Sequence, residues 1–158
     1  EDAADAALLI RDTLQELNIS SFPKTSGASG IQIYIPVGNQ YTYEEARIIN
    51  HFFGSYFSSK HSNHFTIERT VKNRGKKIYF DYLQMWYKKT IISPYSPRAV
   101  ESAAVSMPVT WDELEKGCHP SDFTLFNVKN RLETMGDLFD VLYNEKSYQN
   151  LSFILENL

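Results

Sequence analysis

Cysteine, long apolar runs and net charge are all scarce in this sequence, and each shortage excludes a class of protein. The 158 residues include one cysteine, Cys118, so no internal disulfide can form, and this usage fits a reducing cytoplasm. The longest apolar runs, such as residues 6–10, are far too short to cross a bilayer. No stretch has the pattern of a signal peptide. We therefore expect a cytoplasmic protein without a membrane partner.

Aromatic residues, in contrast, are abundant, with ten Phe, ten Tyr and two Trp. Because many of them must fill a hydrophobic core, an aromatic residue alone does not indicate a base-stacking site. A hydrophobic content of 42% with 22% charged residues is ordinary for a soluble globular protein. A chain of this length can form one compact domain with a sizeable core, but hardly two.

The charges are unevenly distributed along the chain, although the net charge of −3 carries no nucleic-acid signature. Residues 68–89 contain seven Lys or Arg and only two acidic residues, Glu68 and Asp81, a local excess of five. Such a segment can attract phosphate groups. It is equally typical of a solvated hairpin edge, where lysine prevents strands of other molecules from pairing. Charge alone leaves both interpretations open.

Two periodicities predict an α/β (α+β) fold in which helices flank a mixed sheet. Apolar residues at three- and four-residue spacing from Ala7 to Leu17 predict a helix that stops near Asn18. Period-two alternation predicts strands over residues 31–35, 65–70 and 77–84, of which the last is the most regular. Because the helical pattern is already under way at the start, we interpret residues 1–158 as the C-terminal portion of one domain, truncated at its N-terminus.

Capping boxes predict where two further helices begin. One pairs Thr42 with Glu45, and the other pairs Thr110 with Glu113 before a short helix. The apolar face expected for the first of these helices comprises Ala46, Ile49, Phe53, Tyr56 and Phe57. Later helices are expected near residues 128–135, 138–143 and in the C-terminal tail.

Residues 24–30 are polar and punctuated by glycine, and are predicted to form a loop before the strand at 31–35. Ser26-Gly27-Ala28-Ser29-Gly30 offers hydroxyls and unobstructed backbone N–H groups, which are the ingredients of an anion-binding nest. In a Walker A loop a Lys-Ser/Thr pair follows the glycines, but no such pair follows Gly30. The segment also precedes a strand rather than a helix. Most such Ser/Gly loops are simply loops, so this pattern alone is a weak signal.

Asp81 and two arginines are the other candidates for chemistry. Asp is disfavoured in strands, so Asp81 needs either an ion-pair partner on a neighbouring strand or a role as a metal ligand. Arg74 and Arg98 each offer a planar fork that suits phosphate oxygens, but an isolated Arg is more often a surface residue. The four histidines and Cys118 lack zinc-ligand spacing, and no G-x-S-x-G elbow supports a hydrolase.

Four segments in order along the chain carry a resemblance to one family: residues 22–36, 74–84, 94–98 and 105–114. Together they resemble the primase-polymerase domain of bacterial ATP-dependent DNA ligase D, within the archaeo-eukaryotic primase superfamily. The resemblance implies a nucleotidyltransferase that adds nucleotides at DNA ends during non-homologous end joining. The implied partners are an NTP or dNTP, DNA ends, a Ku-type end-binding protein and a ligase domain, in the bacterial cytoplasm at the nucleoid.

The same resemblance implies roles for particular residues. Asp81 is the implied catalytic residue, one of three carboxylates that hold two divalent cations, Mn²⁺ or Mg²⁺. The implied nucleotide-binding residues are Ser26, Gly27, Ser29, Gln32, Arg74, Gln84 and Arg98.

Several departures from the family pattern favour a second interpretation. The Asp-x-Asp pair of the first family motif is absent, and Asp2 and Asp5 are spaced wrongly to replace it. Residues that stand where the family commonly has His, Lys, Asn or Arg are, respectively, Gln32, Ser29, Met85 and Val100. We therefore keep the alternative of a noncatalytic nucleic-acid or partner-binding module with the same fold, and we expect this chain alone not to polymerise.

Overall fold

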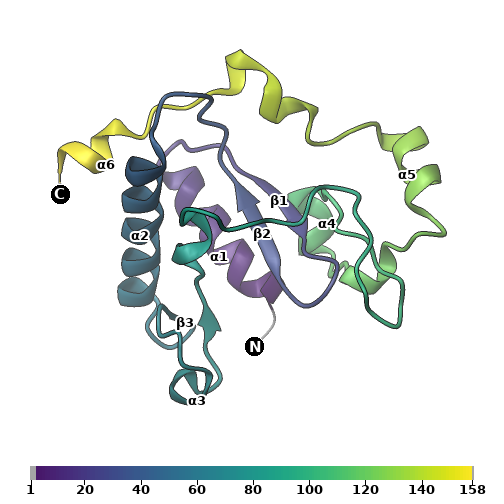
Figure 1. Ribbon diagram of the computed structural model, residues 1–158, viewed down its shortest axis with the longest axis horizontal. Helices are drawn as coiled ribbons and strands as arrows, with labels where there is room; N and C mark the ends of the chain where they lie inside the picture. The colour runs from purple at the N-terminus through teal and green to yellow at the C-terminus, as the bar shows by residue number, and fades with distance from the viewer. Residues whose placement is uncertain (1–2, 158) are drawn as a thin grey trace. The chain divides into compact units, whose positions relative to one another are not determined.

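The computed structural model describes residues 3–157, which fold into two compact units (Figure 1). Unit 1 comprises residues 37–91 and 149–157, and unit 2 comprises residues 3–36 and 92–148. Asp2, weighed above as a replacement carboxylate, lies outside the described residues. Within residues 3–157, no helix is both long enough and apolar enough to cross a membrane.

Unit 2 is built on a short hairpin, in which β1 (Phe22–Thr25) pairs antiparallel with β2 (Ile31–Tyr34). A further extended segment, residues 104–109, runs along β1. It is joined to that strand by backbone hydrogen bonds, one of them from the N–H of Thr25 to the carbonyl of Met107 at 2.8 Å. Strand β2 was predicted, whereas β1 was not.

Helix α1 (Ala3–Glu16) precedes the hairpin and ends where the sequence predicts. Asn18 has a φ of 57°, in the left-handed region, and its N–H donates to the carbonyl of Gln15 at 2.9 Å. The N–H of Ile19 donates to the carbonyl of Leu14 at 2.8 Å. This pair of bonds is a Schellman motif, which satisfies the carbonyls of the last turn.

The other helical elements of unit 2 follow the hairpin's third segment. They are α4 (Trp111–Glu115), η2 (Pro120–Asp122), α5 (Val128–Met135), η3 (Asp140–Tyr143) and η4 (Glu145–Ser147). The capping box of α4 is confirmed, since Thr110 Oγ1 accepts from the N–H of Glu113 and the Glu113 carboxylate accepts from the N–H of Thr110. The prediction of α5 is confirmed at both ends, and η3 covers most of the helix expected at 138–143.

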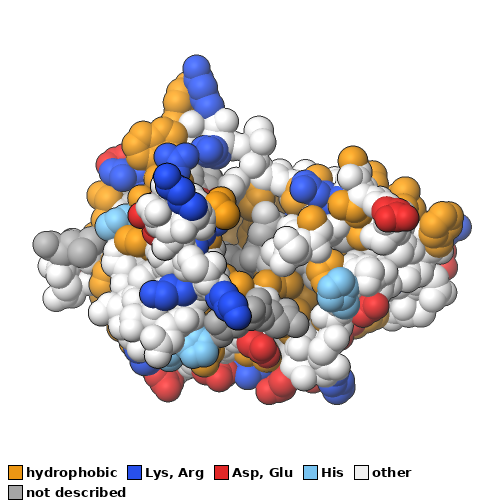
Figure 2. Space-filling view, turned by 90° about the horizontal axis from the view of Figure 1, so that it is seen from below, with side chains coloured by type: hydrophobic (Ala, Val, Ile, Leu, Met, Phe, Trp, Pro, Cys, Tyr) orange, Lys and Arg blue, Asp and Glu red, His pale blue; other side chains and the backbone are white. Residues whose placement is uncertain are grey.

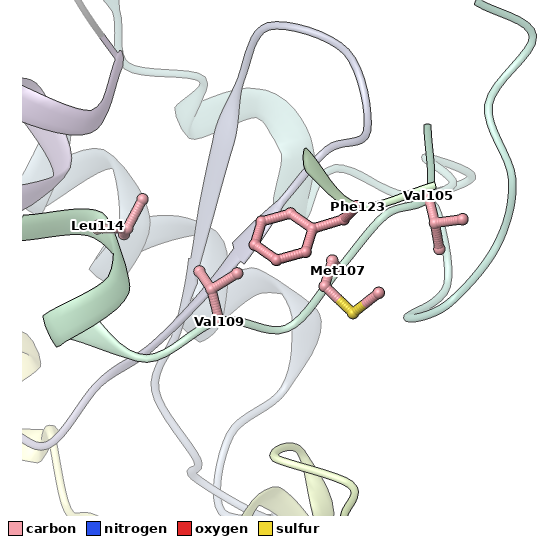
Figure 3. Close-up of a cluster of buried hydrophobic side chains, with 5 residues drawn as sticks. All are labelled: Val105, Met107, Val109, Leu114 and Phe123. Atoms are coloured by element: carbon pink, nitrogen blue, oxygen red, sulfur yellow. The ribbon is translucent and has the colours of Figure 1, made fainter. Parts of the chain in front are cut away.

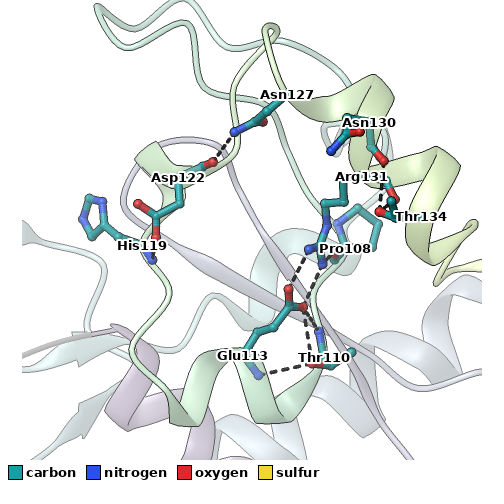
Figure 4. Close-up of polar contacts among 9 residues, drawn as sticks. All are labelled: Pro108, Thr110, Glu113, His119, Asp122, Asn127, Asn130, Arg131 and Thr134. Carbon is teal, nitrogen blue, oxygen red and sulfur yellow. Dashed lines mark hydrogen bonds and ion pairs between the residues drawn. The ribbon is translucent and has the colours of Figure 1, made fainter.

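A bidentate ion pair fastens α5 to α4 (Figure 4). Both terminal nitrogens of Arg131 donate to the Glu113 carboxylate, at 2.6 and 2.7 Å. Burial alone would raise the pKa of Glu113, but the bonds from Arg131 and Thr110 outweigh it and the pKa is lowered. Arg131 also lies over the ring of Phe123, 4.9 Å from its centre.

The core of unit 2 centres on five buried side chains drawn in Figure 3: Val105, Met107, Val109, Leu114 and Phe123. Val105, Met107 and Val109 alternate along residues 104–109, so their side chains share one face of this extended segment, and that face lies in the core. Burying each such side chain stabilises the fold by about 1.5–3 kcal/mol.

Unit 1 is organised around the long helix α2 (Tyr43–Lys60), whose predicted capping box at Thr42 is confirmed. Its buried face includes Ile49, Phe53 and Phe57, as predicted. The placement of Tyr56 on that face was wrong, since its side chain lies at the exposed margin. Phe57 is completely buried, and its ring stacks on that of Phe80 with centres 5.9 Å apart.

The remaining elements of unit 1 are short. They are β3 (Phe65–Thr66), α3 (Val71–Arg74), β4 (Ile78–Tyr79), η1 (Tyr82–Met85) and α6 (Ser152–Glu156), which confirms the helix expected in the tail. Strands β3 and β4 pair in parallel. The basic segment is therefore not a hairpin, because α3 carries the chain back between two parallel strands.

The strand predicted over residues 77–84 was wrong beyond Tyr79. The backbone turns there, and the N–H of Tyr82 donates to the carbonyl of Phe80 at 2.9 Å. Phe80 and Tyr82 both lie against Gly54 of α2, so the apolar residues of the alternating pattern are buried through a turn rather than along a strand. The α/β class is confirmed, with one antiparallel and one parallel pair of strands in place of a single sheet.

Candidate functional site

The loop between β1 and β2 is closed by Ser26. Its hydroxyl oxygen accepts hydrogen bonds from the N–H groups of Ala28 at 3.2 Å and Gly30 at 3.1 Å. Two of the backbone donors expected to line an anion nest are therefore directed at Ser26. The N–H groups of Gly27, which is buried, and of Ser29, which is exposed, make no hydrogen bond within residues 3–157.

Gly27 lies directly against Arg98. A Cβ at Gly27 would collide with Arg98 Cγ and would come within 3.0 Å of the backbone N of Ser106. The backbone of Gly27 has a φ of 73°, which residues with a side chain rarely adopt. Glycine is thus required twice at this position, by conformation and by the close approach of the Arg98 stem.

Arg98 is held by its own backbone. Its N–H donates to the carbonyl of Ala104 at 2.8 Å, and Pro97 forms an antiparallel bridge with Val105. The half-buried side chain therefore projects from a segment that is fastened to residues 104–106, which in turn lie along β1. Two segments far apart in the sequence, the Ser26-Gly27 loop and the segment that carries Arg98, are thus brought together.

Lys24 is the residue of this cluster that sequence reasoning missed. It was assigned to the loop, but it lies in β1 and is completely buried. Its ammonium donates to the carbonyl of Ile92 at 3.0 Å and to Ser106 Oγ. Burial and, to a smaller extent, the positive charge of Arg98 lower the pKa of Lys24 to about 8. Within the described residues, no carboxylate forms an ion pair with Lys24 or Arg98.

Gln32 lies opposite Lys24 in the hairpin register, so their side chains share one face of the strand pair. Its side-chain Oε1 is buried and accepts no hydrogen bond within the described residues. A buried acceptor without a donor is costly. Ser29 is exposed at the tip of the loop.

Asp81 belongs to unit 1 and is not in the middle of a strand, which corrects the sequence interpretation. It follows β4 and precedes η1, with a φ of −79° and a ψ of 75°. Its side chain is exposed, and no ion pair or hydrogen bond joins its carboxylate to another residue of 3–157. The alternative of an Asp paired with a neighbouring Lys or Arg is therefore not what the structure contains. The carboxylate oxygens are free to accept a ligand.

Arg74 and Gln84, also in unit 1, already hold their own loops. The Arg74 guanidinium donates to the carbonyls of Glu68 at 2.8 Å and Arg69 at 2.6 Å, and lies 4.0 Å from the centre of the Tyr79 ring. The side-chain amide of Gln84 donates to the carbonyl of Thr90 at 2.8 Å. Each would have to give up or share a contact to touch a nucleotide.

The predicted residues thus fall into two groups. Ser26, Gly27, Ser29, Gln32 and Arg98 are in unit 2, and Arg74, Asp81 and Gln84 are in unit 1. The unit 2 group, with Lys24, presents two cations and free N–H groups with no paired carboxylate, a combination that attracts anions. Within residues 3–157, no three His, Cys, Asp or Glu side chains are placed to hold a metal together.

Comparison with known proteins identifies the family. Residues 1–139 match the model of LigD, primase-polymerase domain. The chain belongs to this family. The bifunctional non-homologous end joining protein LigD of Bacillus subtilis is 39% identical over 157 residues, which cover 99% of this chain and 26% of that protein. The multifunctional non-homologous end joining protein LigD of Mycolicibacterium smegmatis is 27% identical over 129 residues. This match covers 82% of this chain and 17% of that protein.

A solved structure of the LigD family shares the fold. The polymerase domain of Mycobacterium tuberculosis ligase D, in complex with DNA, superimposes with a TM-score of 0.80 at 28% identity. The match covers 88% of this chain and 48% of that domain's chain. This chain therefore spans about half of the solved LigD polymerase domain and about a quarter of the Bacillus protein.

Proposed function

We propose that this chain is the nucleotide-binding portion of a LigD-type nucleotidyltransferase that adds nucleotides at DNA ends during non-homologous end joining. The observation that carries the proposal is the convergence of the Ser26-Gly27 loop, Arg98 and buried Lys24 without a neutralising carboxylate. DNA ends, a Ku-type protein and a ligase domain are its proposed partners; the names of its relatives give non-homologous end joining, and the solved polymerase domain is in complex with DNA.

The triphosphate of an NTP or dNTP is the proposed ligand of the unit 2 cluster. The N–H of Gly27 and the guanidinium fork of Arg98 donate to phosphate oxygens, and the N–H of Ser29 supplements them. We also assign Gln32, which lies opposite Lys24 in the hairpin and shares its face, to the nucleotide. In unit 1, we assign Arg74 to the phosphates and Gln84 to the nucleotide.

Asp81 is the residue that we assign to a divalent cation, Mn²⁺ or Mg²⁺. Its exposed, unpaired carboxylate fits the oxygen ligands that such cations prefer. When bound, the cation supplies charge stabilisation at the phosphate that is transferred. One carboxylate is a partial ligand set for the two-cation site of the proposed reaction.

A second candidate, a noncatalytic nucleic-acid or partner-binding module, is favoured by that partial set. Within residues 3–157 Asp81 belongs to no group of three or more His, Cys, Asp or Glu side chains that could hold a metal. The two candidates agree on the fold and differ in whether nucleotide binding leads to nucleotide addition.

Nucleotide binding to the purified chain tests the proposal. With a fluorescent triphosphate, Arg98→Ala should weaken binding by about 1.5–3 kcal/mol, the range for hydrogen bonds to charged groups. Arg98→Lys should recover part of it, because the charge stays but the fork is lost. Lys129→Ala, at a highly exposed site on α5, is the control for charge. The affinity for the nucleoside without phosphates should be the same in all these variants. An equal loss of affinity for nucleoside and triphosphate would refute the phosphate role.

A further inference from the structure

An aromatic and basic loop in unit 1 contains none of the residues that we assign to the nucleotide. Residues 85–89, Met-Trp-Tyr-Lys-Lys, begin at the last residue of η1 and are all exposed. Tyr87 is 72% exposed and Trp86 is 49% exposed. Two adjacent aromatic side chains left in water forgo burial that each would favour elsewhere.

The loop is held in place rather than merely unpacked. Its base is closed by the hydrogen bond from the Gln84 side chain to the carbonyl of Thr90, and the N–H of Lys89 donates to the carbonyl of Trp86 at 3.0 Å. The Arg47 guanidinium lies 5.2 Å from the centre of the Trp86 ring. Because Arg47 supports the indole and Trp86 is still half exposed, a flat ligand can approach the indole from solvent.

Positive charge surrounds these rings. Lys88 lies 5.4 Å from the centre of the Tyr87 ring, and within residues 3–157 neither Lys88 nor Lys89 forms an ion pair. Nearby in the sequence, the exposed basic residues of unit 1 continue through Arg69, Lys72, Lys76 and Lys77. Figure 2 shows one face of the molecule on which Lys and Arg side chains lie beside hydrophobic ones.

We propose that the loop 85–89 binds single-stranded nucleic acid, with Trp86 and Tyr87 stacking on bases and Lys88 and Lys89 contacting phosphates. Sites for single strands commonly combine aromatic side chains with cations. Every base has a flat face that can stack on an aromatic ring, and every phosphodiester group carries a negative charge. A protein partner fits less well, since lysine is depleted from protein interfaces. The choice of nucleic acid as the partner rests on the proposed function. The new element is the surface that the strand contacts.

The experiment measures binding of a labelled oligothymidylate of about 16 nucleotides to the 158-residue chain. Tyr87→Ala and Trp86→Leu should each weaken binding roughly 5-fold or more, as expected for the loss of one stacked base. Lys88→Ala with Lys89→Ala should lower the slope of log K against log salt by about 1.4, at roughly 0.7 for each phosphate contact. Tryptophan fluorescence should be quenched by the oligonucleotide in the parent chain and not in Trp86→Leu, which retains Trp111.

Matched controls make the result specific. Tyr43 is 73% exposed at the start of α2 in the same unit, so Tyr43→Ala removes an equally exposed ring and should leave binding unchanged. Lys129→Ala with Lys146→Ala changes the net charge equally at exposed sites in unit 2. If the Trp86 and Tyr87 variants bind like Tyr43→Ala, the surface is wrong. The assignment is also wrong if the Trp86 and Tyr87 variants abolish self-association of the chain but leave oligonucleotide binding intact.

Triphosphate binding separates this inference from the proposed function. The loop variants should retain the parent affinity for the triphosphate, and Arg98→Ala should retain affinity for the oligonucleotide. If the parent chain binds the oligonucleotide but not the triphosphate, the proposed function is overturned and the loop assignment stands.

Discussion

A lysine ammonium removed from water usually lies beside a carboxylate, because an isolated buried charge is costly. Lys24 instead has two neutral acceptors, the carbonyl of Ile92 and Ser106 Oγ, and its charged neighbour is Arg98. Burial and then this neighbour lower the pKa of Lys24 from 10.5 to about 8. The charged form of Lys24 therefore destabilises the fold, and an anion bound beside it, as we propose, would offset that cost.

The stability of the chain should consequently rise with pH through a defined window. Between about pH 8 and pH 10.5 the unfolded chain holds a proton on Lys24 that the folded chain has released, so raising the pH favours the folded state. The gain is at most about 3 kcal/mol. Urea unfolding of the parent chain and Lys24→Met across this window should show the parent gaining relative to the variant.

Other groups that titrate in the window cancel in this difference. Tyr34, whose ring lies 6.0 Å from the Lys24 ammonium, stays neutral there because burial, followed by Tyr143, raises its pKa to about 12. Two parallel curves of unfolding free energy against pH would contradict the buried, unpaired state of Lys24.

Among the candidate site residues, Ser26, Gly27 and Arg98 could be named from the motif segments, whereas the burial of Lys24, in the segment 22–36, could not be predicted. Gly27 and Arg98 come from different segments and lie against each other in unit 2, while their roles stay predictions. A lysine beside a Ser/Gly loop is normally exposed, so its sequence context predicts a solvated side chain. Its burial depends on Ser106, which lies 82 residues later.

At the scale of elements, α2 and the turn after β4 approach each other at a glycine. A Cβ on Gly54 would come within 3.1 Å of Phe80 Cδ1 and 3.2 Å of Ile67 Cγ2. Glycine inside a helix costs about 1 kcal/mol relative to alanine. Here that cost is offset because the missing side chain lets the aromatic residues of unit 1 pack against the helix backbone.

Gly54→Val should therefore lower the free energy of unfolding by about 1–3 kcal/mol, the usual effect of overpacking a core. Ser59→Val is the matched control, because it places the same β-branched residue on the exposed face of α2. Thermal or denaturant unfolding monitored by circular dichroism measures both. Equal stabilities of the two variants would show that the space beside Gly54 is not tightly packed.

Elements defined by local chemistry were the ones that the sequence predicted. The capping boxes at Thr42 and Thr110 and the helix stop at Asn18 depend on residues within one turn, and all three are confirmed. The long strand at 77–84 was wrong because alternation records burial and not pairing. β1 was missed because its polar end is buried only by residues 104–109.

At the scale of the whole molecule, we expect no primer extension by this chain alone. Two divalent cations roughly 3.5–4 Å apart repel each other strongly, so they need several carboxylates. Within residues 3–157 Asp81 is part of no group of three or more His, Cys, Asp or Glu side chains that could hold a metal. The purified chain, with Mn²⁺, a nucleoside triphosphate and a primed DNA end, should bind nucleotide without elongating the primer. Robust elongation would overturn the assignment of Asp81 as one ligand of an incomplete set.

The hairpin of unit 2 and the segment that buries Lys24 are separated by all of residues 37–91, which form the body of unit 1. During synthesis at about 5–20 residues per second, the 82 residues between Lys24 and Ser106 take roughly 4–16 s to be added. For that interval, β1 has no partner along the edge where residues 104–109 later lie, and the Lys24 ammonium stays hydrated. The loop after β1 therefore acquires its buried cation only when Ser106 arrives, so a ribosome stalled before that codon displays the loop beside a hydrated Lys24.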